Sequence, residues 1–209
     1  MDHEEALARM NEVQRIMERT TLYTLLPGAS AIIGGILVLI GCGVSYAMIH
    51  SVDFRAVLSL DMDKQWLFCV LWFVIGVVAV AQECVLALLA SKRQGMSPAA
   101  RPARFAAWSL SPSVFVAVVI TIEFMIRAHG YIEYVVPVWM MCYGTGVYTA
   151  GLFSVKLPRL LGLAFICMGA VGMTVFNQYG LVLAALSFGL LHIAFGCIVL
   201  ARTRKGASA

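Results

Sequence analysis

Two ionisable side chains interrupt long apolar stretches of the sequence. His192 is in the last stretch, and Glu83, preceded by Gln82, is in the second. Such residues are rare at membrane depth and mark functional sites by default. Here they fit a proton relay, a site for a quinone or another polar ligand, or one axial ligand of a haem. They also fit a structural role, in which each side chain forms a hydrogen bond across packed helices.

The position of His192 along its stretch predicts where it points. It lies roughly 18 Å from the start of the stretch, at about 1.5 Å per residue. Gly189 precedes it by three residues and Gly196 follows it by four. This spacing predicts that the imidazole shares the small-residue face and points toward neighbouring helices. A haem with two histidine ligands at this depth is not expected, because His50 and His129 lie at the outer boundary.

A second charged pair lies near the end of the third stretch. Glu123 and Arg127 are four residues apart, which predicts a local ion pair on one helix face. The sequence contains no Walker loop, no GxSxG motif and no HExxH motif. Its six cysteines form no CxxC pair and are interpreted as small packing residues. We therefore expect no catalytic residue, no metal site and no enzyme activity, and we predict no cofactor, with haem or quinone left open.

The composition indicates the elements that carry these residues. Of 209 residues, 61% are hydrophobic and 12% are charged, whereas a soluble domain has about 25% charged residues. An integral membrane protein of the all-α class is therefore predicted, a polytopic bundle of six transmembrane helices. Each predicted span has enough residues to cross a hydrocarbon layer of about 30 Å. The six spans are Leu22–His50, Trp66–Ala90, Phe105–Ile126, Tyr134–Phe153, Leu157–Phe176 and Gly180–Leu200.

The chain divides into three parts. Residues 1–21 alternate apolar and charged side chains at helical spacing and are predicted to form a cytoplasmic amphipathic helix. Residues 22–200 form the six-helix bundle, and residues 201–209 form a basic cytoplasmic tail. The links between the last three spans have only about three residues each, which predicts that these three helices pack side by side.

Small residues within the spans indicate helix contacts. Lipid tails are as apolar as leucine, so close backbone approach through small side chains drives helix association. The residues that we expect at these contacts are Gly35, Gly41, Gly144, Gly162, Gly169, Gly189 and Gly196.

The distribution of Lys and Arg predicts the orientation. Twelve of the fifteen lie in the N-terminal segment, the loops after the second and fourth spans, and the tail. The positive-inside rule then places both termini in the cytoplasm. The expected membrane is a bacterial inner membrane. The net charge of +4 is spread between apolar stretches, so no nucleic-acid partner is expected.

Two segments resemble a family of six-span bacterial membrane proteins. They are Val13-Gln-Arg-Ile-Met-Glu-Arg-Thr-Thr-Leu-Tyr, followed by Pro27-Gly-Ala-Ser-Ala-Ile-Ile-Gly-Gly, and Phe188-Gly-Leu-Leu-His-Ile-Ala-Phe-Gly196. The resemblance implies a six-span bundle and marks His192 as a family residue. It implies no activity.

Three functions fit these patterns. The first is a non-enzymatic accessory or structural subunit of a larger membrane complex, or the membrane partner of a regulator. The second is a transporter of protons or a small solute that uses Glu83 and His192. The third is a redox protein that binds haem or quinone. The expected partners are the lipid bilayer and either another protein or a second copy of the chain.

Overall fold

The computed structural model describes residues 28–93, 101–127, 129–152 and 156–207, which form helices joined by short turns, without a strand. Five of its helices are long and apolar enough to cross a membrane. The chain is therefore an all-helical membrane protein. The amphipathic helix expected at residues 1–21 lies outside the described residues.

Each apolar stretch forms a helix. The long helices are α2 (Gly28–Ile49), α3 (Met62–Arg93), α4 (Arg101–Ile126), α5 (Val135–Leu152) and α6 (Lys156–Thr174). The last helix is continuous but has three parts, α7 (Gly180–Ala184), the π-helical η4 (Ala185–Leu191) and α8 (His192–Ala207). Three short 3₁₀ helices lie between them, η1 (Phe54–Ser59), η2 (His129–Tyr134) and η3 (Asn177–Tyr179). The helix α5 is long enough, with 18 residues, but it is not among the five candidate spans.

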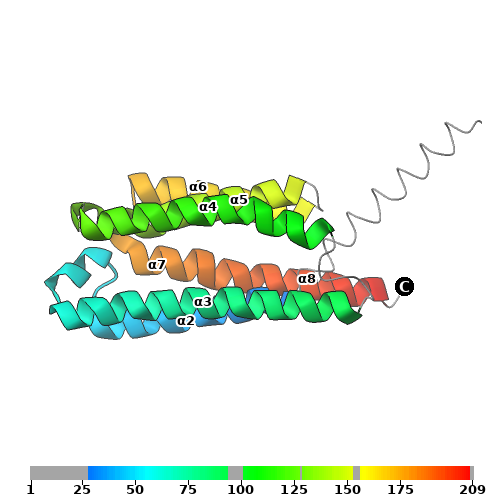
Figure 1. Ribbon diagram of the computed structural model, residues 1–209, viewed down its shortest axis with the longest axis horizontal. Helices are drawn as coiled ribbons and strands as arrows, with labels where there is room; N and C mark the ends of the chain where they lie inside the picture. Colours follow the sequence, from blue (N-terminus) through cyan, green and yellow to red (C-terminus); the bar gives the residue numbers. More distant parts are fainter. Residues whose placement is uncertain (1–27, 94–100, 128, 153–155, 208–209) are drawn as a thin grey trace, which may run out of the picture.

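The helices form two units of three, seen as two layers in Figure 1. The middle unit consists of α4, α5 and α6, and the terminal unit consists of α2, α3 and the continuous helix α7–α8. Contacts between the units concentrate at one end of the bundle, where α7 meets α5 and α6, and where η1, η2 and η3 meet. We call η1, η2 and η3 the cap.

The expected arrangement of the last three helices is only partly correct. The helices α5 and α6 pack along their length, but α7–α8 touches them mainly at its start and then packs along α2. A short link holds together only the two helix ends that it joins. The rest of the packing depends on which helix faces are complementary.

Glycine pairs explain the contact between α2 and the last helix. A Cβ at Gly35 would lie 2.6 Å from the carbonyl oxygen of Gly189. Two turns away, Gly28 and Gly196 approach each other in the same way. These glycines bring the two backbones into contact without intervening side chains, the arrangement that favours helix association in membranes.

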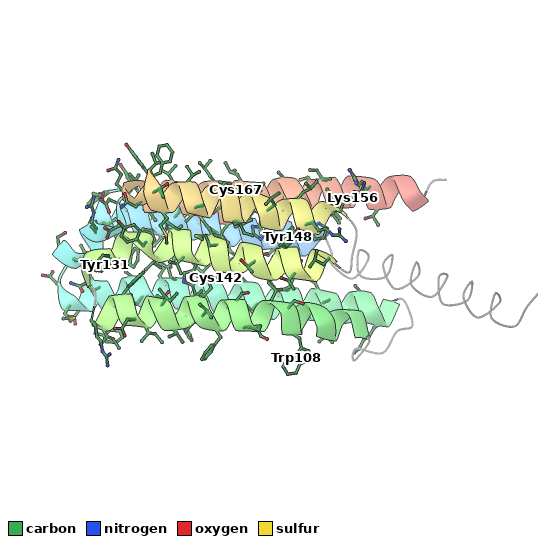
Figure 2. All side chains as sticks on the ribbon, turned by 90° about the horizontal axis from the view of Figure 1, so that it is seen from above. Trp108, Tyr131, Cys142, Tyr148, Lys156 and Cys167 are labelled. Atoms are coloured by element: carbon green, nitrogen blue, oxygen red, sulfur yellow. The ribbon has the colours of Figure 1, made fainter. Side chains whose placement is uncertain are left out.

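The outer faces of α3 and α4 are apolar and largely uncovered. None of the most apolar part of α3 is buried, and little of α4 is. Figure 2 shows Trp108 of α4 pointing away from the bundle, and its side chain is 72% exposed. Such faces suit contact with lipid tails, while the polar side chains described next lie between helices.

Candidate functional site

One side-chain hydrogen bond joins the two helix units within the described part of the chain. The Tyr143 hydroxyl on α5 lies 2.8 Å from Nε2 of His192, at the start of α8. The other side-chain hydrogen bonds between long helices stay within one unit, such as Trp139 to Thr121 and Trp72 to Ser45. The Tyr143–His192 bond is therefore the polar connection between the units.

Aromatic rings enclose this bond. The Tyr143 ring lies 5.0 Å from Phe165 and 5.5 Å from Phe188, measured between ring centroids. The His192 ring stacks on Phe188 at 6.0 Å and meets the edge of Phe165 at 5.2 Å. Because Phe165 is fully buried, the bond lies in surroundings of low polarity. A hydrogen bond in such surroundings is electrostatically stronger than in water.

The π-helical turn gives the second nitrogen of His192 a partner. Nδ1 lies 3.4 Å from the backbone carbonyl oxygen of Ser187. A carbonyl can only accept, so this contact places the proton on Nδ1. In the neutral ring Nε2 is then the acceptor, and the Tyr143 hydroxyl donates to it. π-Helical turns inside longer helices are frequent at functional sites.

Glu83 lies on α3, on the other side of the site. Its carboxyl is hydrogen-bonded to the side chain of Ser30 on α2. No described hydrogen bond joins Glu83 to His192, but Glu83 is close enough for its charge to act on the Tyr143 phenol. The two residues expected from sequence are therefore related through Tyr143 and not by direct contact.

Gln82 is adjacent to Glu83 and also turns toward α2. Its side-chain nitrogen donates to the backbone carbonyl of Ser30 at 3.2 Å. Its side-chain oxygen is buried, and it has no hydrogen-bond partner among the described residues.

Glu123 and Arg127 are not part of this site. Their side chains are exposed and form an ion pair at 3.8 Å at the end of α4. The i, i+4 spacing suffices for this contact, which involves a single helix. Because the pair lies at the cap end, it does not reach the Tyr143–His192 bond.

The glycines expected at helix contacts have different neighbours. Most of them would meet another backbone: Gly35, Gly144, Gly162, Gly169 and Gly196. A Cβ at Gly189 would first meet the side chain of Leu39. In contrast, Gly41 faces the side chains of Ile75 and Trp72 on α3. The expectation that His192 shares the face of Gly189 and Gly196 is wrong in detail. Those glycines pack on α2, whereas the imidazole contacts rings of the middle unit. Three residues turn a helix by slightly less than a full turn and four by slightly more, so His192 faces a different direction from both glycines.

Sequence analysis missed three residues of interest. Tyr143 lies roughly 12 Å from the start of its helix. Its polar hydroxyl within an apolar stretch was the signal that could have identified it. Ser30 is 2% exposed and resembles any other small packing residue in sequence. Glu133 falls in a loop by sequence, yet it is 6% exposed, and its Oε2 has no hydrogen-bond partner in the described segments.

The cap also holds an exposed ion pair. Asp53 precedes η1 and accepts hydrogen bonds from the Arg55 backbone and guanidinium, at 2.9 and 2.6 Å. Partial burial alone would raise the pKa of Asp53, but the hydrogen bonds and positive charge of Arg55 outweigh it and hold this pKa below its usual value. The same contacts raise the pKa of Arg55, with a smaller contribution from the charge of Glu133.

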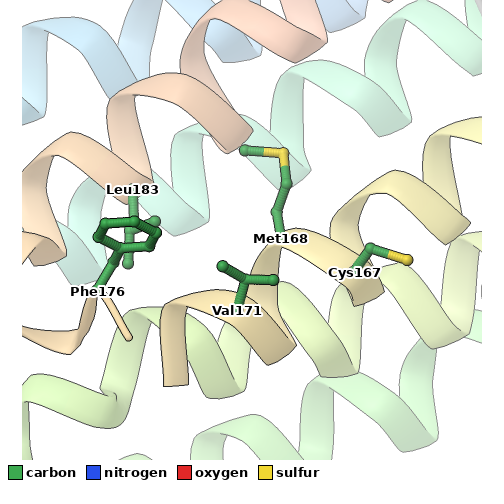
Figure 3. Close-up of a pocket in the computed structure, with 5 residues that line it drawn as sticks. All are labelled: Cys167, Met168, Val171, Phe176 and Leu183. Atoms are coloured by element: carbon green, nitrogen blue, oxygen red, sulfur yellow. The ribbon is translucent and has the colours of Figure 1, made fainter. Parts of the chain in front are cut away.

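A shallow hollow of about 320 Å³ lies between α6 and the start of the last helix, as Figure 3 shows. Cys167, Met168 and Val171 line one side, and Phe176 and Leu183 line the other. The lining has no protonatable residue apart from the thiol, so the hollow offers no counterpart to the polar site. Within the described ranges, no three His, Cys, Asp or Glu side chains come together as a metal site would require.

The comparisons with known proteins found no family model, no curated protein and no solved structure that matches this chain.

Proposed function

We propose that this chain is a transporter of protons in which the Tyr143–His192 bond links two moving helix units. The proposal includes six spans, with α5 as the sixth. At 18 residues, α5 is about 27 Å long. It lies between α4 and α6, so protein covers much of its surface and it requires fewer apolar side chains than a helix facing lipid.

The observation that carries the proposal is the position of the Tyr143–His192 bond. Transporters often work by rocking one helix bundle against another around a site near the membrane midplane. Here the hydrogen bond between the units is formed by an imidazole, a group that can bind and release a proton. A change at His192 would therefore act directly on the contact between the units.

The chemistry of the bond supports proton movement. When His192 takes up a second proton, Nε2 becomes a donor and can no longer accept from Tyr143. The phenol oxygen then accepts from Nε2, and its own proton needs a new acceptor. Glu83 is the carboxyl group whose charge acts on Tyr143. A proton can thus pass from His192 through Tyr143 to Glu83 once the side chains of Tyr143 and Glu83 approach each other.

The remaining functions expected from sequence stay predictions. An accessory subunit would use the apolar faces of α3 and α4, but lipid covers such faces equally well. A haem would need a free nitrogen on His192, whereas both ring nitrogens have protein partners. Absence of enzyme activity, a bacterial inner membrane with both termini in the cytoplasm, and the resemblance to a six-span family remain parts of the proposal.

Proton flux into proteoliposomes tests the function. Purified protein is reconstituted with an entrapped pH-sensitive dye, and an imposed pH gradient is followed with valinomycin and potassium present to remove the membrane potential. We expect faster dissipation than in protein-free vesicles, and at least a tenfold slower flux for Tyr143→Phe. Thr121→Val is the matched control, because it removes a hydrogen bond to Trp139 within one unit and should leave the flux unchanged.

Two results would contradict the proposal. One is a flux equal to that of empty vesicles between pH 5.5 and 8. The other is a Tyr143→Phe protein that is as fast as the wild type. Stoichiometric partner proteins that co-purify with an inactive chain would support the accessory-subunit function instead.

A further inference from the structure

Three polar groups meet at Ser30, where α2 and α3 touch. Ser30 is 2% exposed, and its backbone carbonyl accepts a hydrogen bond from Nε2 of Gln82. The carboxyl of Glu83 is hydrogen-bonded to its side chain. Gly34 leaves space for this arrangement, because even a Cβ there would lie 3.7 Å from Nε2 of Gln82. Two adjacent side chains of α3 therefore converge on one residue of α2.

The amide oxygen of Gln82 is the unusual atom in this group. It is buried and has no partner among the residues that the structure describes. Oε1 is bonded to the same carbon as Nε2, the atom that donates to the Ser30 carbonyl. Buried polar atoms without partners are rare in native proteins and are costly, since the interior does not replace the hydrogen bonds of water. The atom thus points to a ligand that brings positive charge.

We propose that the Gln82 amide oxygen, the Glu83 carboxylate and the Ser30 hydroxyl bind a small monovalent cation. Carboxylate, amide and hydroxyl oxygens are the ligands that hard cations prefer. The single carboxylate balances one positive charge, and a second charge would stay uncompensated in the low-dielectric interior. Sodium and ammonium both carry one positive charge and both bind oxygen atoms. The oxygen atoms would coordinate sodium directly, whereas ammonium would donate hydrogen bonds to them.

The cation site deepens the proposed function, because in a transporter it would hold the ion that drives movement of the units. That role rests on the proposed function, but cation binding itself does not. Glu83 then has two states, with either a proton or the cation bound, and the two ligands compete for the same oxygen atoms. Binding can be measured on the purified protein without any transport.

Thermal unfolding in detergent tests the site. The full chain is heated in chloride salts of sodium, ammonium, potassium or choline at constant ionic strength and pH 7.5. A ligand that binds only the folded protein raises the midpoint, by about 5 °C or more at one hundred times its dissociation constant. We expect such a rise in sodium or ammonium relative to choline, and the salt that gives the larger rise identifies the cation.

Variants decide whether the rise comes from this site. Glu83→Gln should abolish it, and Gln82→Leu and Ser30→Ala should each weaken the apparent affinity at least tenfold. Glu123→Gln, which removes an exposed carboxyl on α4, and His192→Gln should keep it. Equal midpoints in all four salts would overturn the proposal, and so would a Glu83→Gln protein that still responds to the cation. If Glu83→Gln does not fold, an unchanged cation affinity in Gln82→Leu and Ser30→Ala overturns it. A cation response without proton flux leaves this site standing while the transport function fails.

Discussion

The Tyr143 hydroxyl lies 2.8 Å from Nε2 of His192, and the two residues belong to different helix units. Most other contacts between the units are near the cap, so this bond holds them together at a distance from it. The bond is direct, enclosed by aromatic rings and dependent on the protonation state of one imidazole.

A double-mutant cycle measures the connection between Tyr143 and His192. We expect Tyr143→Phe and His192→Leu each to destabilise the protein by about 1 kcal/mol, the scale of hydrogen bonds between membrane helices. The double variant should recover a coupling energy of about 0.6 kcal/mol. Unfolding in mixed detergent micelles gives the free energies. Strictly additive losses would show that the two side chains do not stabilise each other.

The glycine contact between α2 and the last helix should not tolerate a methyl group. In Gly35→Ala the new Cβ would meet the Gly189 backbone at 2.6 Å, and we expect a loss of about 1–3 kcal/mol from overpacking. Gly43→Ala is the control on the same helix, because nothing lies within 4 Å of its Cβ position. Its higher helix propensity predicts a gain of up to about 1 kcal/mol. If both variants had the same stability, close backbone approach would not hold these helices together.

The cap should become less stable at low pH. The folded pKa of Asp53 is lower than its usual value, so its interactions stabilise the protein above the unfolded pKa and are lost as pH falls through the folded one. Wild type should therefore exceed Asp53→Asn in stability at pH 7, with the difference declining below about pH 4. Unfolding midpoints across this range provide the measurement. A difference that grows toward low pH would reverse the sign and refute the assignment.

Reporter fusions test the orientation. A periplasm-active enzyme fused after Gly130, in the cap, should be active, and one fused after Ala209 should be inactive. A cytoplasm-active reporter should give the opposite pattern, and the twelve-to-three split of Lys and Arg is the basis for this expectation. Activity of the periplasmic reporter at the C-terminus would show that the predicted orientation is wrong.

Local patterns predicted those features that depend on one segment at a time. The apolar stretches predicted each helix, because a helix in lipid satisfies its backbone hydrogen bonds internally and needs only apolar length. The Glu123–Arg127 ion pair also follows from spacing on a single helix. The number of spans is less direct, since α5 is less apolar than a helix exposed to lipid and is not among the five candidate spans.

The amino-acid sequence by itself thus determined the class of protein, the helices and the two ionisable residues within apolar helices. The tertiary structure decided their partners. It placed the last helix against α2 and paired Tyr143 with His192 and Ser30 with Glu83. It also buried a side-chain oxygen of Gln82 that has no partner among the described residues. The physical reason is that hydropathy depends on each segment alone, whereas a contact between helices depends on the complementary shapes of two segments far apart in the chain.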